Sequence, residues 1–305
     1  RYMMSMLASY DILPWLNVTG RVRIDNANSL YTQKLYATSD ATITEGGSNG
    51  HYTESRGYDA QTYADIIANF NHTFTNELSV MANIGGSIND ISTDSFSYRG
   101  PIQANGLANV FNVMDLDDVK KRAEKSGWHD QTISAFTSIE LGWKKGLFVT
   151  LTGRYDLASQ LAGSSSKGFF YPSAGLSWVP TEFWDMGILS YMKFRGSVAS
   201  VGLPFPRFLT MPTYEYDATS KIWQDKTHYP IHDLKPERTL TYEVGADFRL
   251  WNDLSISATW YMADTYNQTF DAQLPPSSSY STIYLQTGHV RNMGIESSVG
   301  YDHTW

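Results

Sequence analysis

The chain has 305 residues, which is enough for one large domain or two smaller ones, and its formal net charge of −8 argues against a nucleic-acid partner. It contains no cysteine, which excludes a disulfide scaffold and a thiolate metal site, and no apolar run reaches the roughly 18 residues that a membrane-spanning helix needs. Only 18% of its residues are charged and 14% are aromatic, a balance typical of a β-rich chain with one face in lipid, although a soluble β-sandwich or propeller shares it.

Segments in which apolar and polar residues alternate follow one another along the chain, and each predicts a strand with one apolar face. In chain order, these segments lie at residues 16–25, 78–89, 133–143, 147–156, 192–198, 239–250 and 254–262. The alternation is unbroken from Thr239 to Leu250, where Val244 falls on the apolar face and Thr241 on the polar face. In all of these segments the charged residues fall on the polar face.

Short and long connections alternate between the predicted strands. The short ones lie near residues 11–14, 75–77, 144–146, 180–187 and 251–253, and the long ones near 26–61, 89–130, 158–168, 202–237 and 265–288. The strands themselves run for about 10–13 residues, which suits a tilted membrane strand better than the about 5–6 residues of soluble sheets. Because bacterial outer-membrane barrels have short periplasmic turns and long outer loops, the sequence predicts an all-β chain, an antiparallel transmembrane β-barrel segment of about eleven strands.

The loop at residues 202–237 is the candidate binding segment. It carries a group of aromatic and acidic residues, namely Trp223, Tyr214, Tyr216, Asp225 and Tyr229. Aromatic faces beside hydrogen-bonding groups are what a sugar ring or a peptide needs, and loops on a rigid scaffold often carry binding functions. The alternative is that these rings pack on neighbouring loops or on a partner protein.

No catalytic or metal-binding constellation is recognisable in the sequence. His228 and His232 have helical ligand spacing, but Pro230 interrupts them inside a loop. The charged residues on the strand segments, such as Arg154 and Asp156, are expected to line a solvated wall. We therefore expect no enzyme activity, no cofactor and no bound metal.

Residues 115–125 begin with aspartates and end with lysines and an arginine. They lack the glycine and the terminal glutamate of a calcium-binding loop. Because acidic residues favour the start of a helix and basic residues its end, the pattern predicts a short helix within the second long loop.

Seven segments of the chain resemble one protein family, and they occur in the family's order. They read WLNVTGRVRID (15–25), ANGLANVFNVMD (104–115), LFVTLTGRYDLASQL (147–161), FFYPSAGLSWVPTEFW (169–184), MKFRGSVASVG (192–202), LKPERTLTYEVGADFRLWNDLSISATWYMADTYNQTF (234–270) and RNMGIESSVGY (291–301). The family is that of the SusC/RagA-type TonB-dependent outer-membrane transporters. The resemblance spans nearly the whole chain, which is similar to the central barrel region of these proteins.

The resemblance implies a barrel of about 22 strands closed around an N-terminal plug. The roughly eleven strands predicted for this chain would form about half of that barrel. We recognise no plug, no TonB-contacting segment, no signal peptide and none of the family's final strands. Since an open sheet edge cannot stand in lipid, residues 1–305 are expected to be part of one barrel domain. The chain is then a proteolytic piece, a partly resolved chain or one segment of a longer polypeptide.

The function implied by the resemblance is TonB-dependent import of a bulky nutrient into a Gram-negative cell, with an oligosaccharide as the preferred solute and a peptide as the alternative. It also implies a SusD-like surface lipoprotein over the outer loops, a TonB complex acting through the plug, and outer-membrane lipid around the barrel. The competing class is a non-transporting surface adhesin or carbohydrate-binding β-protein. Detergent dependence of solubility separates the two, because only the barrel has a lipid-facing stripe.

Overall fold

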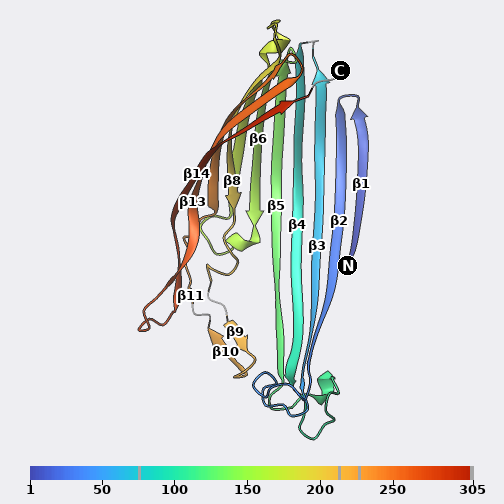
Figure 1. Cartoon of the computed structure of the whole chain (residues 1–305), viewed down its shortest axis with the longest axis vertical. Helices are drawn as coiled ribbons and strands as arrows, with labels where there is room; N and C mark the ends of the chain where they lie inside the picture. Colours follow the sequence, from blue (N-terminus) through green and yellow to red (C-terminus); the bar gives the residue numbers. More distant parts are fainter. Residues whose placement is uncertain (75–76, 212–213, 226–227, 303–305) are drawn as a thin grey trace.

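One large antiparallel sheet makes up most of the computed structural model, which describes residues 1–74, 77–211, 214–225 and 228–302. The sheet has twelve strands in the order β1-β2-β3-β4-β5-β6-β7-β8-β12-β13-β14-β11 (Figure 1). Its strands are β1 Tyr2–Leu13, β2 Leu16–Leu35, β3 His51–Thr73, β4 Leu78–Pro101, β5 Arg122–Trp143, β6 Leu147–Ala158, β7 Gly168–Trp178, β8 Leu189–Leu203, β12 Glu237–Leu250, β13 Leu254–Gln273, β14 Thr282–Tyr301 and the two-residue β11 His228–Tyr229. Eleven of the twelve are long and antiparallel, as the sequence predicts.

Other elements are small and lie outside the sheet. A separate hairpin joins β9 Tyr214–Asp217 to β10 Ile222–Asp225, and three single-turn 3₁₀ helices cover η1 Val113–Asp115, η2 Ser159–Leu161 and η3 Pro180–Glu182. Among the described residues, no helix is long and apolar enough to cross a membrane.

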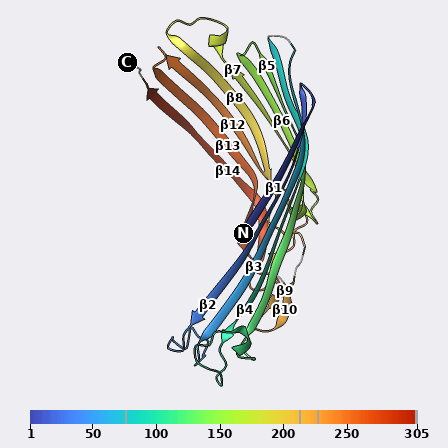
Figure 2. The same ribbon diagram turned by 90° about the vertical axis from the view of Figure 1, so that its right-hand side faces the viewer.

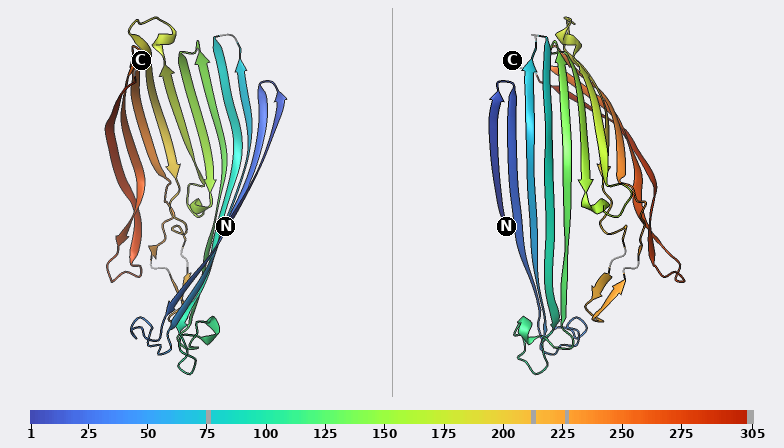
Figure 3. Two further views of the ribbon diagram at one scale, coloured as in Figure 1. Left: turned by 45° about the vertical axis from the view of Figure 1, so that its right-hand side comes forward. Right: turned by 180° about the vertical axis from the view of Figure 1, so that it is seen from behind.

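The five short connections all lie at one end of the sheet. They join β1 to β2, β3 to β4, β5 to β6, β7 to β8 and β12 to β13, and they gather at the upper rim in Figures 1 and 3. The long connections and the β9–β10 hairpin lie toward the opposite end (Figure 3). The prediction that the five short connections share one end is therefore confirmed, and it identifies the two rims of the barrel wall. The connections do not alternate strictly in length, because residues 274–281 between β13 and β14 form a shorter link than residues 179–188 between β7 and β8. We call the two ends of the sheet the turn rim and the loop rim.

Strands β2 to β5 are much longer than the sequence predicts. They run for 20 to 24 residues, and β2 pairs with β3 in unbroken register from Leu16 to Leu35. The prediction of loops throughout 26–61 and 89–130 is wrong at both ends of each range, where these strands continue. The predicted loop at 265–288 is likewise wrong except for residues 274–281, because β13 continues to Gln273 and β14 begins at Thr282. Apolar alternation stops in these parts of the strands, but the backbone ladder continues because its hydrogen bonds do not depend on the side chains. Figure 2 shows these four strands continuing as a narrow extension toward the loop rim.

The predicted helix at residues 115–125 is also wrong. Only η1 is helical there, and β5 begins at Arg122. The Asp117 side chain accepts hydrogen bonds from the backbone amides of Val119 and Lys120, both at 2.9 Å. An aspartate that bonds to nearby amides in this way favours a turn over a helix.

The two faces of the sheet differ as the alternation predicts. Pairing places Val244 beside Gly196 and Trp260, and Trp260 beside Ile295, in one row across four strands. Val244 is 58% exposed and Ile295 75%, so this row presents apolar side chains outward. Exposed apolar rows of this kind mark the lipid-facing side of a barrel. We call this side the apolar face and the opposite side the polar face.

Several charged residues of the polar face form bonded pairs. Arg154 donates to Asp156 at 2.8 Å and to Ser134 at 2.9 Å, while Arg195 donates to Asp247 at 2.9 Å. These residues lie on the polar face and bond to other polar side chains. The sequence predicts that Arg154 and Asp156 line such a polar wall.

Candidate functional site

Three of the predicted binding residues lie together on the β9–β10 hairpin. Trp223 pairs directly with Tyr216 across the hairpin, and their ring centroids are 5.4 Å apart at 58°. Tyr214 is two residues from Tyr216 and therefore shares its face. All three rings are exposed. Asp225 pairs with Tyr214 along the backbone, but its side chain lies outside the described residues.

A side-chain-capped turn holds this hairpin closed. The Asp217 carboxylate accepts from the Thr219 amide at 2.8 Å and from the Ser220 hydroxyl at 2.7 Å. The Ser220 hydroxyl, followed by the Thr219 amide, keeps the pKa of Asp217 below its usual range. Aspartate at the start of a turn commonly bonds to amides two residues on, so the local sequence explains why Tyr216 and Trp223 face each other.

Tyr229, the remaining predicted residue, lies apart from the hairpin. It belongs to β11, which pairs in parallel with Thr282–Ile283 at the edge of β14. The Tyr229 ring makes an edge contact with Tyr280 at 5.4 Å. The predicted set therefore separates into an aromatic hairpin face and a tyrosine pair beside β14.

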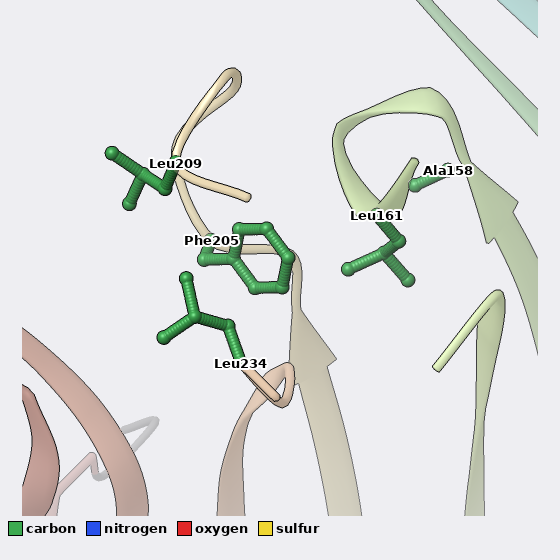
Figure 4. Close-up of a cluster of buried hydrophobic side chains, with 5 residues drawn as sticks. All are labelled: Ala158, Leu161, Phe205, Leu209 and Leu234. Atoms are coloured by element: carbon green, nitrogen blue, oxygen red, sulfur yellow. The ribbon is translucent and has the colours of Figure 1, made fainter. Parts of the chain in front are cut away.

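The loop between β8 and β12 is anchored by a small apolar core. Phe205, Leu209 and Leu234 of this loop pack with Ala158 at the end of β6 and Leu161 of η2 (Figure 4). Phe205 and Leu234 are almost completely buried. A single sheet has no hydrophobic core between layers, so buried clusters in this structure form where loops pack on it. This cluster holds the loop against the polar face of the sheet near the loop rim.

Two polar contacts complete the anchoring at opposite sides of the loop. Arg207 donates to Asp130 of β5 through Nε at 3.1 and 3.2 Å and through Nη2 at 2.5 Å, and its guanidinium lies 3.8 Å above the Trp128 ring. Gln286 of β14 donates to the carbonyl of Lys235 and accepts from its amide, both at 2.6 Å. The loop therefore spans from β5 to β14 across the polar face.

A cavity of about 970 Å³ lies beneath this span. Its walls come from β4, β5, the anchored loop, β12, β13 and β14, and its aromatic and charged lining comprises Trp128, Phe205, Arg207, Phe208, Glu237, Asp271 and Tyr284. The volume is that of a site for a bulky solute. None of these residues is in the predicted set, because they come from five separate parts of the chain. The sequence did contain one signal. Trp128 is an even number of residues from Asp130 and Ser134 and therefore shares their polar face of β5, where a large aromatic ring indicates a contact with another group.

Comparisons with known proteins agree with this architecture. A family model described as "TonB dependent receptor-like, beta-barrel" matches residues 7–305. Two curated relatives from Formosa agariphila, the TonB-dependent receptors P3 and P39, are each 24% identical, over 65% and 84% of this chain. The matches cover 22% and 25% of those relatives, so the chain spans about a quarter of their length.

Solved structures show the same fold. The RagAB peptide importer in its open-open state superposes with a TM-score of 0.80 at 16% identity, covering 97% of this chain and 33% of the matched chain. The ferric-catecholate import receptor Fiu from Escherichia coli K12 superposes with a TM-score of 0.59 at 13% identity, covering 99% of this chain and 45% of the matched chain.

Proposed function

The chain belongs to the TonB-dependent receptor-like β-barrel family of the outer membrane, and we propose that it forms part of the barrel wall of a SusC/RagA-type importer of a bulky nutrient. The observation that carries this proposal is the 970 Å³ cavity on the polar face near the loop rim. Its position suits a solute that has entered from outside but has not yet passed the barrel. The proposal places residues 1–305 in one barrel domain, with no covalent chemistry.

An oligosaccharide is the solute that we propose. Sugar rings present C–H faces to aromatic side chains and hydroxyls to carboxylates and amides. The hairpin face with Trp223, Tyr216 and Tyr214 offers exposed rings at the loop rim, and the cavity offers further rings beside carboxylates. In this scheme the hairpin makes the first contact and the cavity holds the solute afterwards.

A peptide is the second candidate. The structural relative RagAB is described as a peptide importer, and tyrosine-rich surfaces such as Tyr229 with Tyr280 also bind extended backbones. A non-transporting adhesin is not favoured, because the family match covers residues 7–305.

Replacing Trp223 by alanine tests the oligosaccharide proposal. We expect binding of the cognate oligosaccharide to the full-length transporter to weaken by about tenfold, because a stacked ring contributes on the order of 1–2 kcal/mol. Isothermal titration with oligosaccharide and with peptide mixtures measures the affinity. Trp251→Ala at the turn rim is the matched control, because it removes the same side chain far from the hairpin. Binding of peptides alone, or unchanged oligosaccharide binding in the Trp223 variant, contradicts the assignment of the solute.

The proposal also includes two partners, a SusD-like lipoprotein over the loop rim and a TonB complex acting through a plug. We expect the lipoprotein to co-purify with the native transporter in mild detergent. Removing the exposed hairpin, residues 214–225, should weaken that association if the hairpin lies in the contact. Recovery of the transporter alone under the same gentle conditions contradicts the lipoprotein proposal.

A further inference from the structure

The cavity beneath the anchored loop carries unbalanced negative charge. Three charged residues line it, namely Arg207, Glu237 and Asp271. Arg207 is already paired with Asp130 in a bidentate ion pair, so its charge is neutralised. Among the described residues, neither Glu237 nor Asp271 has a side-chain hydrogen bond or ion pair. In the part of the chain that the structure describes, the two carboxylates therefore have no cationic partner beside the cavity.

Both carboxylates are held on rigid strands. Glu237 is the first residue of β12 and pairs with Leu203, while Asp271 lies in β13 opposite Tyr284. Tyr284 and Phe208 add aromatic rings to the same lining. A carboxylate beside an aromatic ring is a favourable place for a cation, because the ring face and the carboxylate attract it together.

The opposite charge would be disfavoured at this site. A solute with a carboxylate or a sulfate would meet the negative charges of Glu237 and Asp271. Arg207, the one guanidinium among the described lining residues, would first have to leave Asp130. A neutral solute can donate hydrogen bonds to Glu237 and Asp271, but it lacks the charge attraction that a cationic group gains there. The lining therefore discriminates by charge as well as by size.

We propose that this cavity selects solutes that carry an ammonium or guanidinium group, and that Glu237 and Asp271 are the specificity-determining residues. The inference rests on the proposed function, since it assigns a class of solute to the same importer. The cationic group can belong to an amino sugar of an oligosaccharide or to a basic residue of a peptide. The chemistry at the carboxylates is the same in both cases.

The test uses the full-length transporter with its lipoprotein and two matched pairs of probes. One pair is a glucosamine tetramer and its N-acetylated form, and the other is a lysine-containing tetrapeptide and its glutamine analogue. Titration at mildly acidic pH keeps the amines protonated. We expect the cationic member of at least one pair to bind about tenfold more tightly than its neutral analogue, and the preferred pair identifies the source of the cation.

The variants Glu237→Gln and Asp271→Asn preserve size and remove one charge each. Each is expected to reduce the cationic preference several-fold, and the double variant to abolish it, with neutral probes unaffected. Asp94→Asn is the control, because this substitution also removes one negative charge. Asp94 follows Thr93 of the cavity in sequence but lies on the opposite face of the sheet. Equal binding of cationic and neutral probes, or an equal loss in Asp94→Asn, overturns the inference while the proposed function stands. If no probe of either pair binds, the inference fails, and the titration of the Trp223→Ala variant tests the proposed function separately.

Discussion

Arginine in place of Val244 is expected to destabilise the folded barrel in the membrane by about 2–4 kcal/mol, whereas arginine at Thr241 is expected to be tolerated. Val244 lies near the middle of β12 on the apolar face, in a row with Trp260 and Ile295. An arginine there would place its charge in hydrocarbon. Thr241 has the opposite parity and lies on the polar face, where charged residues such as Asp247 already stand.

The measurement is folding of the full-length transporter into lipid vesicles under denaturant titration. Arg249→Ala provides a further comparison on the polar face of the same strand, and it should change the free energy of unfolding by less than about 1 kcal/mol. Equal losses for arginine at positions 244 and 241 would mean that the two faces of β12 are in the same environment. That result would remove the basis for a lipid-facing row.

The strands of the membrane part could be predicted from the sequence because lipid imposes a period of two. Between Thr239 and Leu250 every second residue faces hydrocarbon, so the pattern itself reports the environment. The same reasoning underestimated β2 to β5, because their parts nearest the loop rim carry no period of two in the sequence. It also predicted a helix at 115–125, where Asp117 instead forms a turn with Val119 and Lys120.

The candidate site was predictable only where its residues are close in sequence. Tyr214, Tyr216 and Trp223 lie within one hairpin, and their association follows from a short loop of alternating residues. The cavity instead combines Trp128 of β5 with Arg207 of the loop and Asp271 of β13. Its assembly depends on sheet order and on where Phe205 is buried, and neither is encoded in a local pattern.

The contact between Arg207 and Asp130 is expected to control the position of the loop over the cavity. In Arg207→Met, the Asp130 carboxylate, whose side chain is 10% exposed, loses a bidentate partner. Leaving such a group without its charged partner costs about 2 kcal/mol. Because the strand pairing of the sheet does not depend on this contact, the loop should open locally and the barrel should stay folded.

Hydrogen–deuterium exchange on the full-length transporter measures this opening. Amides of residues 205–211 should exchange about 30-fold faster in Arg207→Met, which corresponds to a local cost of about 2 kcal/mol. Lys121→Met is the control, since its ion pair with Asp118 is largely exposed and should contribute less than about 1 kcal/mol.

The double variant Arg207→Met with Asp130→Asn decides whether the two residues act as a pair. Asparagine removes the buried charge that Arg207→Met leaves without a partner, so the double variant should exchange more slowly than additive single effects require. Strict additivity would mean that Arg207 holds the loop through its contact with the Trp128 ring and not through Asp130. In either case, faster opening of residues 205–211 should raise the rate at which solute enters the cavity, because Phe205, Arg207 and Phe208 of this segment form part of its wall.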